Sequence, residues 1–293
     1  FITITHSWPK GPKDISMHAS ISALYIYPVK SLAGISLSQV NVLPTGLEGD
    51  RQWMIVDNSG KFVTQRQIPA MATIKTHFVH GQLSLSHEYH GTIEVTQDPK
   101  TPTALWQIWK DTVEGIEESQ AVSDWLTQVL GEFRGGKLRL VRFNNNAERL
   151  VATRYLENQE STLKLADACP FLITCEASLS DLNQHLPQPM SMDRFRANII
   201  IADTQPWQEY QWQNLRADSL DFAMIGPCQR CPMTSVDQQR GVVATPGQPL
   251  QTLMERFKVG DKKLPYFGQH AHLPNKDTGT LVVGQSLQIL TGN

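Results

Sequence analysis

The sequence has few cysteines, no long apolar run and no excess of charge of either sign. Only 4 of its 293 residues are cysteine, too few and too unevenly spaced for the disulfide framework of a secreted fold. No stretch approaches the roughly 18 consecutive apolar residues that a membrane-spanning helix needs. We therefore expect a cytoplasmic protein without a membrane span, in which a cysteine cluster would serve metal or redox chemistry.

The balance of charge excludes one class of partner. Lys and Arg number 26 against 28 Asp and Glu, which gives a formal net charge of -2. Proteins that bind nucleic acid derive much of their affinity from neutralising phosphates, so no nucleic-acid partner is predicted. A local site for a small anion is compatible with this balance.

Several cofactor-binding motifs are also missing. The chain has no Gly-x-Gly-x-x-Gly fingerprint, no Walker loop, no nucleophile elbow and no cysteine spacing typical of an iron–sulfur cluster. We therefore expect neither nicotinamide binding nor a ferredoxin centre within this chain.

Short β segments dominate the first half of the sequence. Asp57-Asn-Ser-Gly60 is a turn signal between two of them, since Asn and Gly tolerate positive φ. The spacing of the segments favours a barrel or sandwich over alternating βαβ units. The predicted strands of this half cover residues 23–27, 35–43, 51–56, 61–65, 74–79, 82–86 and 92–96.

Helical spacing begins only after residue 119. Trp125, Leu126, Val129 and Leu130 recur at intervals of three and four behind Ser119 or Ser123, which predicts an amphipathic helix ending near Gly131. The rest of the chain mixes both types. Strands are predicted over 138–143, 171–174, 198–202, 221–225 and 279–290, and helices over 178–185 and 250–257.

These elements indicate an α+β, β-rich fold with two units. A loop at Asn144-Asn-Asn-Ala147 marks the expected boundary, which gives units over 21–145 and 146–293. Residues 1–20 lack the features of a signal or transit peptide and are expected to be a leader outside the fold, with Met17 a candidate native start.

The sharpest local signal is Cys228-Gln-Arg-Cys231, directly after a predicted strand. A zinc site would need two further ligands, and a thioredoxin-like dithiol would need a helix, which Pro232 disfavours. A single thiolate for a heavier metal needs only one sulfur, and Arg230 would lower the pKa of that thiol. Both cysteines can also be small buried hydrophobic residues.

Basic residues lie at the ends of predicted strands. Lys30 and Arg51 border the early strands, and Arg194 and Arg196 precede the strand at Asn198. With Ser31 and Asn198 as hydrogen-bond partners, these cations can hold a phosphate or a similar anion. Taken singly, each is equally compatible with a solvated surface charge.

The histidines are weaker candidates for metal binding. His77 and His80, like His87 and His90, have a spacing that puts two side chains on opposite faces of a strand, so surface positions are expected. His270 and His272 would share one strand face near Phe267-Gly-Gln269 and can line a site.

Six motifs in order resemble the MOSC-domain proteins of the amidoxime-reducing type. The resemblance runs from about Ile21 to the C-terminus. The motifs are Tyr27-Pro-Val-Lys-Ser31, Gly49-Asp-Arg51, Pro170-Phe-Leu-Ile with Glu176-Ala-Ser-Leu, Phe195-Arg-Ala-Asn198, Cys228-Gln-Arg-Cys231 with Thr234-Ser-Val-Asp237, and Phe267-Gly-Gln269. The resemblance implies an N-terminal MOSC-type β-barrel domain packed against a MOSC β-barrel domain with a few helices.

The resemblance also implies a molybdenum cofactor, in which a pyranopterin holds the metal and Cys231 supplies a protein sulfur as the catalytic ligand. Cys169, Gln229 and His270 stand at positions where this chain departs from the animal pattern. The implied cofactor-binding residues are Lys30, Ser31, Arg51, Cys169, Arg196, Asn198, Gln229, Arg230 and His270.

The activity implied by the resemblance is reduction of small N-hydroxylated compounds, such as hydroxylamines, amidoximes and N-hydroxylated bases, to amines or amidines. Electrons would come from a separate ferredoxin-like or flavoprotein reductase partner. Two alternatives stay open. One is a sulfur carrier related to cofactor sulfuration, and the other is a zinc-stabilised binding protein using Cys228, Cys231 and His270 or His272.

Overall fold

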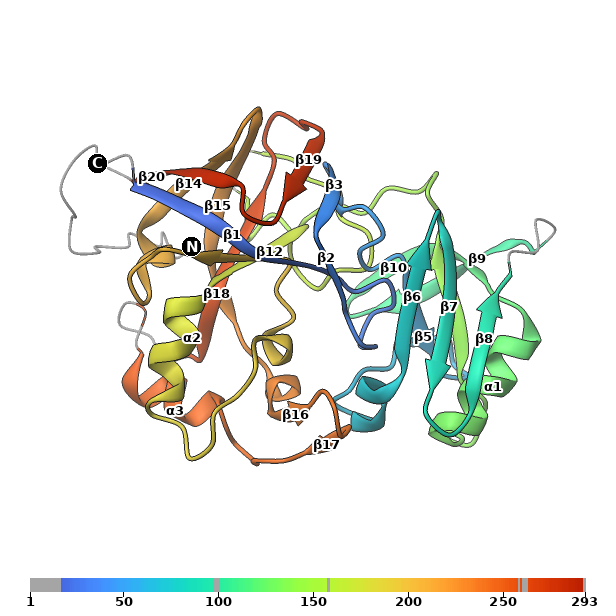
Figure 1. Cartoon of the computed structure of the whole chain (residues 1–293). Helices are drawn as coiled ribbons and strands as arrows, with labels where there is room; N and C mark the ends of the chain where they lie inside the picture. The colour runs from blue at the N-terminus through green and yellow to red at the C-terminus, as the bar shows by residue number, and fades with distance from the viewer. Residues whose placement is uncertain (1–16, 97–100, 157–158, 258, 260–262, 292–293) are drawn as a thin grey trace.

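The computed structural model describes residues 17–96, 101–156, 159–257, 259 and 263–291. Two β-rich halves lie side by side, with the largest sheet on the left of Figure 1 and the strands β5 to β10 on the right. The described residues also form three α-helices, which confirms the predicted α+β, β-rich class. Among the described residues, no helix combines the length and hydropathy that crossing a membrane requires.

A closed barrel of seven strands forms the larger half. The hydrogen-bonded order is β13-β12-β18-β15-β14-β20-β1, and β1 pairs back to β13, while β2 extends the sheet beside β1. Among the strand pairings of the described residues in this sheet, only that of β12 with β13 is parallel. The strands are β1 (Met17–Ile26), β2 (Ile35–Leu37), β12 (Phe171–Cys175), β13 (Ile199–Ala202), β14 (Trp212–Ala217), β15 (Leu220–Gln229), β18 (Tyr266–His272) and β20 (Ser286–Thr291).

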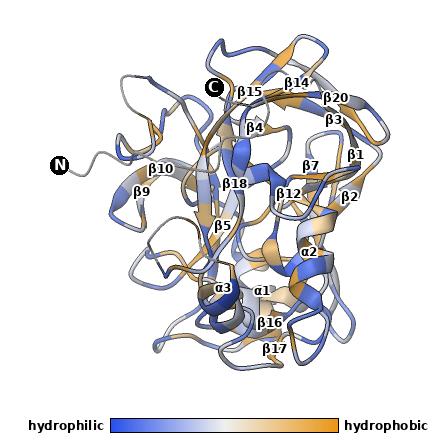
Figure 2. Cartoon of the chain, turned by 90° about the vertical axis from the view of Figure 1, so that its left-hand side faces the viewer, coloured by the Kyte–Doolittle hydropathy of each residue, from blue (hydrophilic) through white to orange (hydrophobic). Residues whose placement is uncertain are grey.

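The barrel interior is filled by alternate residues of its strands. In β14, Trp212, Leu215 and Ala217 are buried, while neighbouring positions face outward. Figure 2 shows hydrophobic and hydrophilic colour interleaved along these strands. Phe171 and Phe222 meet edge to face at the core, with ring centroids 5.1 Å apart.

The first strand departs from the domain division expected from the sequence. Met17–Ser20, placed in the expected leader, pair with Ser286–Ile289, and Ser20–Leu24 pair with β13. Strand β1 therefore belongs to the barrel built mainly from the C-terminal half. Pairing between residues so far apart in the chain closes the barrel and leaves no local signal in the sequence.

The smaller half contains two sheets and one helix. One sheet has the order β5-β11-β10-β9 and the other β6-β7-β8. The predicted strand at 61–65 is reduced to two isolated bridges, Phe62 with Val56 and Lys61 with Gln107. The strands are β5 (Trp53–Val56), β6 (Lys75–Val79), β7 (Gln82–His87), β8 (Gly91–Val95), β9 (Thr103–Ile108), β10 (Asp111–Glu117) and β11 (Arg139–Phe143).

Helix α1 (Gln120–Leu130) follows the predicted periodicity. It begins after Ser119 and ends at Gly131, whose φ of 80° stops the helix. Its buried side includes Val122 and Leu126, and the Trp125 indole donates to the His90 carbonyl at 2.9 Å. The helix thereby packs on the sheet β6-β7-β8.

The remaining elements are short. The other helices, α2 (Glu176–Asn183) and α3 (Leu250–Arg256), start close to their predicted positions. The small sheets and 3-10 helices are β3 (Gln39–Leu43) and β4 (Gly46–Leu47) with β19 (Gly279–Val282), β16 (Val236–Asp237) with β17 (Val242–Val243), η1 (Pro69–Thr73), η2 (Met192–Phe195), η3 (Gln208–Gln211) and η4 (Pro232–Ser235).

Candidate functional site

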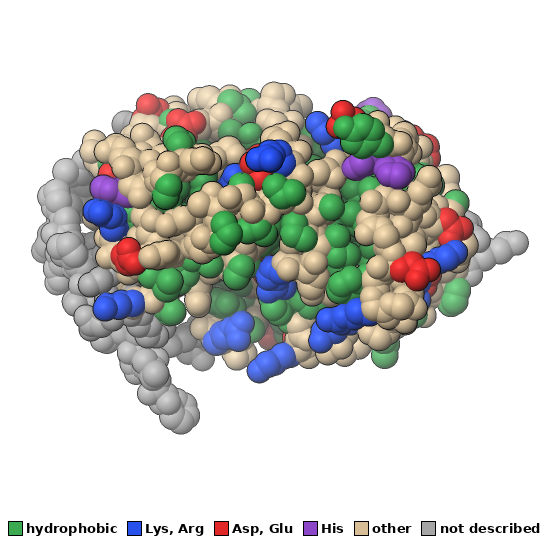
Figure 3. Space-filling view, turned by 90° about the horizontal axis from the view of Figure 1, so that it is seen from below, with side chains coloured by type: hydrophobic (Ala, Val, Ile, Leu, Met, Phe, Trp, Pro, Cys, Tyr) green, Lys and Arg blue, Asp and Glu red, His purple; other side chains and the backbone are tan. Residues whose placement is uncertain are grey.

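A cavity with a volume of about 690 Å³, including its open mouth, lies where the two halves meet. Seen from below, Figure 3 shows Lys and Arg side chains gathered along the middle of this face. Nine of the ten predicted site residues line the cavity, whereas the tenth, Gln229, is exposed and does not line it. The nine are Lys30, Ser31, Arg51, Cys169, Arg196, Asn198, Arg230, Cys231 and His270.

Backbone in the left-handed region directs three of these side chains. Ser31, Arg51 and Arg196 have φ values of 69°, 43° and 53°. Non-glycine residues rarely adopt this region, and such strain tends to concentrate at functional sites. Ser31 and Arg51 lie in turns and Arg196 directly follows η2 (Met192–Phe195), and all three side chains line the cavity.

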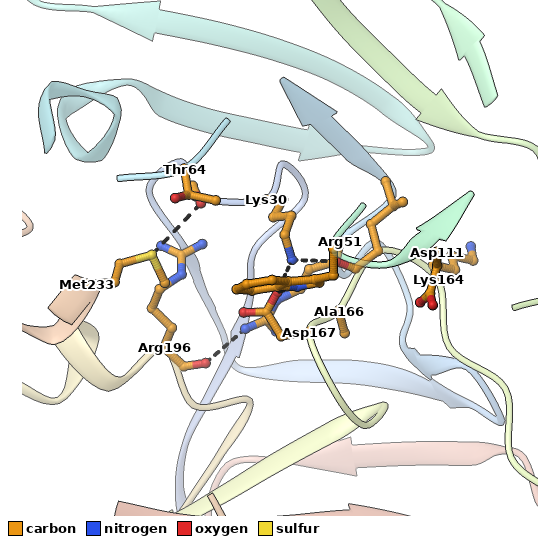
Figure 4. A network of polar contacts seen from close by, with 12 residues as sticks. Lys30, Arg51, Thr64, Asp111, Lys164, Ala166, Asp167, Arg196 and Met233 are labelled. Carbon is orange, nitrogen blue, oxygen red and sulfur yellow. Dashed lines mark hydrogen bonds and ion pairs between the residues drawn. The ribbon is translucent and has the colours of Figure 1, made fainter. Parts of the chain in front are cut away.

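Two guanidinium groups contact the same tyrosine ring. The Cζ atoms of Arg51 and Arg196 lie 4.4 Å and 4.2 Å from the centroid of Tyr27. Arg51 donates to both carboxylate oxygens of Asp50 and to the Arg196 carbonyl at 3.0 Å, a link drawn in Figure 4. Burial lowers the pKa of Arg196 to about 10, where it is still a cation at neutral pH.

Arg196 is not fully paired inside the protein. Its Nη1 donates to the Leu32 carbonyl at 2.7 Å, but its Nη2 is buried without a hydrogen-bond partner among the described residues. A buried donor left unpaired is costly, so Nη2 is a free donor for an anion in the cavity.

Lys30 is paired with a carboxylate at the wall of the cavity. Its ammonium contacts Asp167 and donates to the Leu165 carbonyl at 2.9 Å. Burial lowers the pKa of Lys30, and Asp167 opposes that effect. Burial would raise the pKa of Asp167, but Lys30 outweighs it and holds that pKa well below its usual range. Each partner of the pair thus favours the charged form of the other.

The cysteines differ sharply in environment. Burial alone would raise the pKa of Cys228, but the charges of Arg230 and His270 lower it to about 7. The Arg230 guanidinium donates to the Cys228 sulfur at 2.8 Å. Burial raises the pKa of Cys169, which stays a neutral thiol.

Cys231 is the more accessible cysteine of the pair. It is half-buried, lines the cavity and precedes η4, a 3-10 turn rather than the α-helix of a thioredoxin-like dithiol. Arg230 also donates from Nη2 to the Phe195 carbonyl at 2.7 Å, which fixes the point where β15, carrying Cys228, passes into the segment that carries Cys231.

The Asn198 amide is occupied by backbone groups. Its Oδ1 accepts from the Leu172 N–H and its Nδ2 donates to the Tyr25 carbonyl, both at 3.2 Å. The side chain thus ties β12 to β1 at the edge of the cavity. Its predicted contact with a cofactor stays a prediction.

Sequence reasoning missed several residues that line the cavity, among them Thr64, Arg66, Asp167 and Met233. Asp167 and Arg66 lie in loops without a motif, and Arg66 directly follows a segment predicted as a strand. The one signal for these residues in the sequence was the polar segment Thr64-Gln-Arg66, because binding residues are often carried by loops and turns.

The histidines only partly match expectation. His77 and His80 are exposed, but His87 and His90 do not lie on opposite faces, because their rings are 5.1 Å apart. Strand β7 ends at His87, and the following turn brings His90 back beside it. His272 is buried away from the cavity lining.

No three His, Cys, Asp or Glu side chains of the described residues converge on a point that suits a metal ion. The zinc alternative needed such a cluster at Cys228, Cys231 and a histidine, so it is disfavoured. Arg194, the other predicted cation, pairs with Asp237 at 3.1 Å instead of lining the cavity.

Comparison with known proteins gives two family matches. Residues 18–133 match the MOSC N-terminal beta barrel domain, and residues 160–288 match the MOSC domain. Mitochondrial amidoxime-reducing component 1 of Homo sapiens is 30% identical over 301 residues, which cover 97% of this chain and 87% of that protein.

Two further comparisons give one match to part of a longer protein and one weak structural likeness. Molybdenum cofactor sulfurase of Drosophila grimshawi is 33% identical over 262 residues, covering 87% of this chain but 32% of that protein. A crystal structure of the YUAD protein from Bacillus subtilis aligns over 95% of this chain and 99% of that chain, with a TM-score of 0.42 and 8% identity.

Proposed function

The chain belongs to the family of MOSC-domain proteins that includes the mitochondrial amidoxime-reducing components, and we propose that it reduces N-hydroxylated compounds by means of a molybdenum cofactor. The observation that carries the proposal is the meeting of the Cys231 thiol with five Lys and Arg side chains in one cavity. A soft sulfur ligand beside a cationic cradle suits a metal held by an anionic organic group.

The residues present fit a phosphorylated pterin that carries the metal. Three lining side chains have buried polar atoms without a partner among the described residues, namely Arg196 Nη2, Arg230 Nε and His270 Nδ1. These atoms can hydrogen-bond to pterin or phosphate. Cys231, as one half-buried thiol, can supply a single sulfur ligand without the converging cluster that zinc requires.

Reduction of an N-hydroxyl group to an amine consumes two electrons and two protons and releases water. When bound, the molybdenum would supply the two-electron redox chemistry. Cys231 would hold the metal through Sγ, while Lys30, Arg51 and Arg196 would hold the phosphate. With a pKa of about 7, the Cys228 Sγ can hold or release a proton at neutral pH.

The electrons would come from a separate ferredoxin-like or flavoprotein reductase. The given sequence contains no flavin, haem or iron–sulfur motif that would deliver them.

A second candidate is a role in handling sulfur on the cofactor. The match to molybdenum cofactor sulfurase and the three cysteines that line the cavity, Cys169, Cys228 and Cys231, favour it. Both candidates need the cofactor, but only the first turns over an N-hydroxylated substrate.

The test combines elemental analysis with turnover of benzamidoxime, using an artificial low-potential electron donor and measuring benzamidine. We expect molybdenum in the purified wild-type protein and benzamidine formation. Cys231→Ala should remain folded and lose turnover, while Cys175→Ala, at a buried cysteine outside the cavity, should keep it. Turnover by Cys231→Ala contradicts the assigned role, and molybdenum without turnover favours the sulfur-handling candidate.

A further inference from the structure

One cation that lines the cavity, Arg66, has both terminal nitrogens of its guanidinium unpaired among the described residues. Arg66 lines the cavity, and its Nε donates to the Thr64 hydroxyl at 3.1 Å. Neither of its terminal nitrogens has a hydrogen-bond or ion-pair partner within the described part of the chain. These two nitrogens form the forked end of the guanidinium.

The other cations of the cavity are already engaged with the protein. Lys30 contacts Asp167, Arg51 binds Asp50 through both carboxylate oxygens, and Arg230 binds Cys228 and the Phe195 carbonyl. Arg196 donates to Leu32 and keeps one buried free nitrogen. Arg66 therefore differs in presenting a complete fork to an incoming molecule.

The Arg66 guanidinium is held in place before any ligand arrives. Its Cζ lies 4.4 Å from the centroid of the Trp109 ring, and the Thr64 hydroxyl fixes its Nε. Trp109 is itself anchored, because its indole N–H donates to Asp167 at 2.9 Å and its ring packs 5.0 Å from Phe62. A fork that is already ordered loses less entropy when it binds a carboxylate.

The backbone supports the same arrangement. Trp109 has a φ of 55° in the turn between β9 and β10, and its side chain is 40% exposed. A bulky residue in the left-handed region is uncommon and is retained where its surroundings hold it there. The Trp109–Asp167 hydrogen bond joins the β9–β10 hairpin of one half to the loop before β12 of the other, beside the mouth.

From this geometry we infer that Arg66 selects N-hydroxylated substrates that carry a carboxylate, with Thr64 and Trp109 as positioning residues. The carboxylate would bind both terminal nitrogens of Arg66 at the mouth, while the N-hydroxyl end reaches toward Cys231. This inference rests on the proposed reduction and adds the class of substrate. Paired N–H···O bonds between guanidinium and carboxylate supply both affinity and orientation.

The test compares two probes that differ only in charge, para-carboxybenzamidoxime and its neutral analogue para-carbamoylbenzamidoxime. In the wild-type protein we expect a KM about ten-fold lower for the carboxylate, since a charge-assisted pair at a partly exposed site is worth about 1.4 kcal/mol. Arg66→Ala should bring the ratio of the two KM values close to one. Arg66→Lys should restore only part of the preference, because an ammonium has no fork.

A control and a positioning variant complete the design. Arg216→Ala removes an exposed arginine from β14 that does not line the cavity, so the same loss of charge should leave the ratio as in the wild-type protein. Trp109→Leu should lower the preference with a smaller effect on the neutral probe, a result that a general loss of stability would not produce. Calorimetric titration of each protein with the two probes gives a readout independent of turnover.

The outcomes separate the inference from the proposed function. If the wild-type protein reduces neither probe, the proposed function fails. If it reduces both with equal KM, or if Arg66→Ala keeps the preference, the inference alone is overturned. Loss of molybdenum in Arg66→Ala would also overturn it, because Arg66 would then hold the cofactor instead of the substrate.

Discussion

The Nη1 of Arg230 donates a hydrogen bond of 2.8 Å to the sulfur of Cys228, two residues before it in the chain. The same guanidinium reaches the Phe195 carbonyl through Nη2. Arg230 therefore links the strand end that carries the cysteine pair to the segment that leads into Arg196, and it places a positive charge against one particular thiol.

The first prediction concerns the acidity of that thiol. Arg230→Met removes the charge that contributes most to lowering the pKa of Cys228, so the pKa should rise from about 7 toward its ordinary value. The measurement is the rate of alkylation of Cys228 by iodoacetamide as a function of pH, resolved by mass spectrometry of peptides. Cys169 should stay unreactive in both proteins, because burial raises its pKa.

The same midpoint of alkylation in wild type and Arg230→Met would show that Arg230 does not set the charge of Cys228. A shift in Cys169 instead would show that the two buried thiols had been assigned the wrong environments.

A second prediction concerns Asn198, whose amide ties two strands together. Asn198→Ala leaves the Leu172 N–H without its acceptor in a buried position, so it should lower the free energy of unfolding by about 2 kcal/mol. Urea denaturation measures this loss. Asn214→Ala in β14, which removes a half-buried side-chain hydrogen bond to Asp221 in β15, should cost less than about 1 kcal/mol.

If Asn198→Ala keeps its stability but loses molybdenum, the side chain acts on a ligand instead of on the strands. That result would return Asn198 to the role expected from its motif.

The motif of Asn198 predicts a contact with a ligand, whereas the structure shows that its amide ties two strands together. Local patterns and motifs in the sequence therefore predict only part of the fold and of the site. Helix α1 was predictable, because the spacing of Trp125, Leu126 and Val129 is a local pattern. The grouping of Lys30, Arg196 and Cys231 was predictable only through ordered motifs. Closure of the barrel by β1 and β13 depends on pairing between distant residues, for which no local pattern exists.

Arg66 and Asp167 could not be found in the sequence for a related reason. Each is a single charged residue in a loop, where surface charges are common and carry no periodicity. The role of Arg66 follows from its contact with Trp109, more than 40 positions away in the chain. The role of Asp167 follows from its contact with Lys30, more than 130 positions away. Arg66 and Asp167 come to line the same cavity only when the chain folds.

A third prediction uses a buried carboxyl group outside the cavity. Glu209 is 0% exposed, and burial raises its pKa from 4.5 to about 7, while the Ser178 hydroxyl donates to it at 2.7 Å. The folded protein thus favours the neutral acid. Because the unfolded chain ionises first, Glu209 should reduce the stability of the protein as pH rises from about 4.5 to about 7.

Glu209→Gln keeps an acceptor for Ser178 but cannot ionise. Its free energy of unfolding should match wild type near pH 4.5 and exceed it by up to about 3 kcal/mol above pH 7, since one pKa unit corresponds to about 1.4 kcal/mol. Denaturant unfolding across this range checks the prediction. A difference that does not change with pH would show that Glu209 stays ionised in the folded protein.

A fourth prediction concerns Gly268, the glycine of the Phe267-Gly-Gln269 motif beside His270. Its φ is 76°, and a Cβ there would lie 2.6 Å from the Thr174 Cγ2 and 2.7 Å from the Ile173 carbonyl oxygen. Strand β18 can therefore approach β12 this closely only without a side chain at 268. The motif has a packing cause, because the register of β18 on β12 sets His270 opposite Leu172 at the cavity wall.

Gly268→Ala should lower the free energy of unfolding by about 3 kcal/mol, since both left-handed strain and a clash with backbone oppose it. Gly284→Ala is the matched control, because Gly284 has a φ of 86° but open space around its Cβ position. It should lose only the strain, about 1 kcal/mol. Equal losses in the two variants, measured by urea denaturation, would mean that β18 can move away from β12, and that Gly268 does not determine where His270 lies.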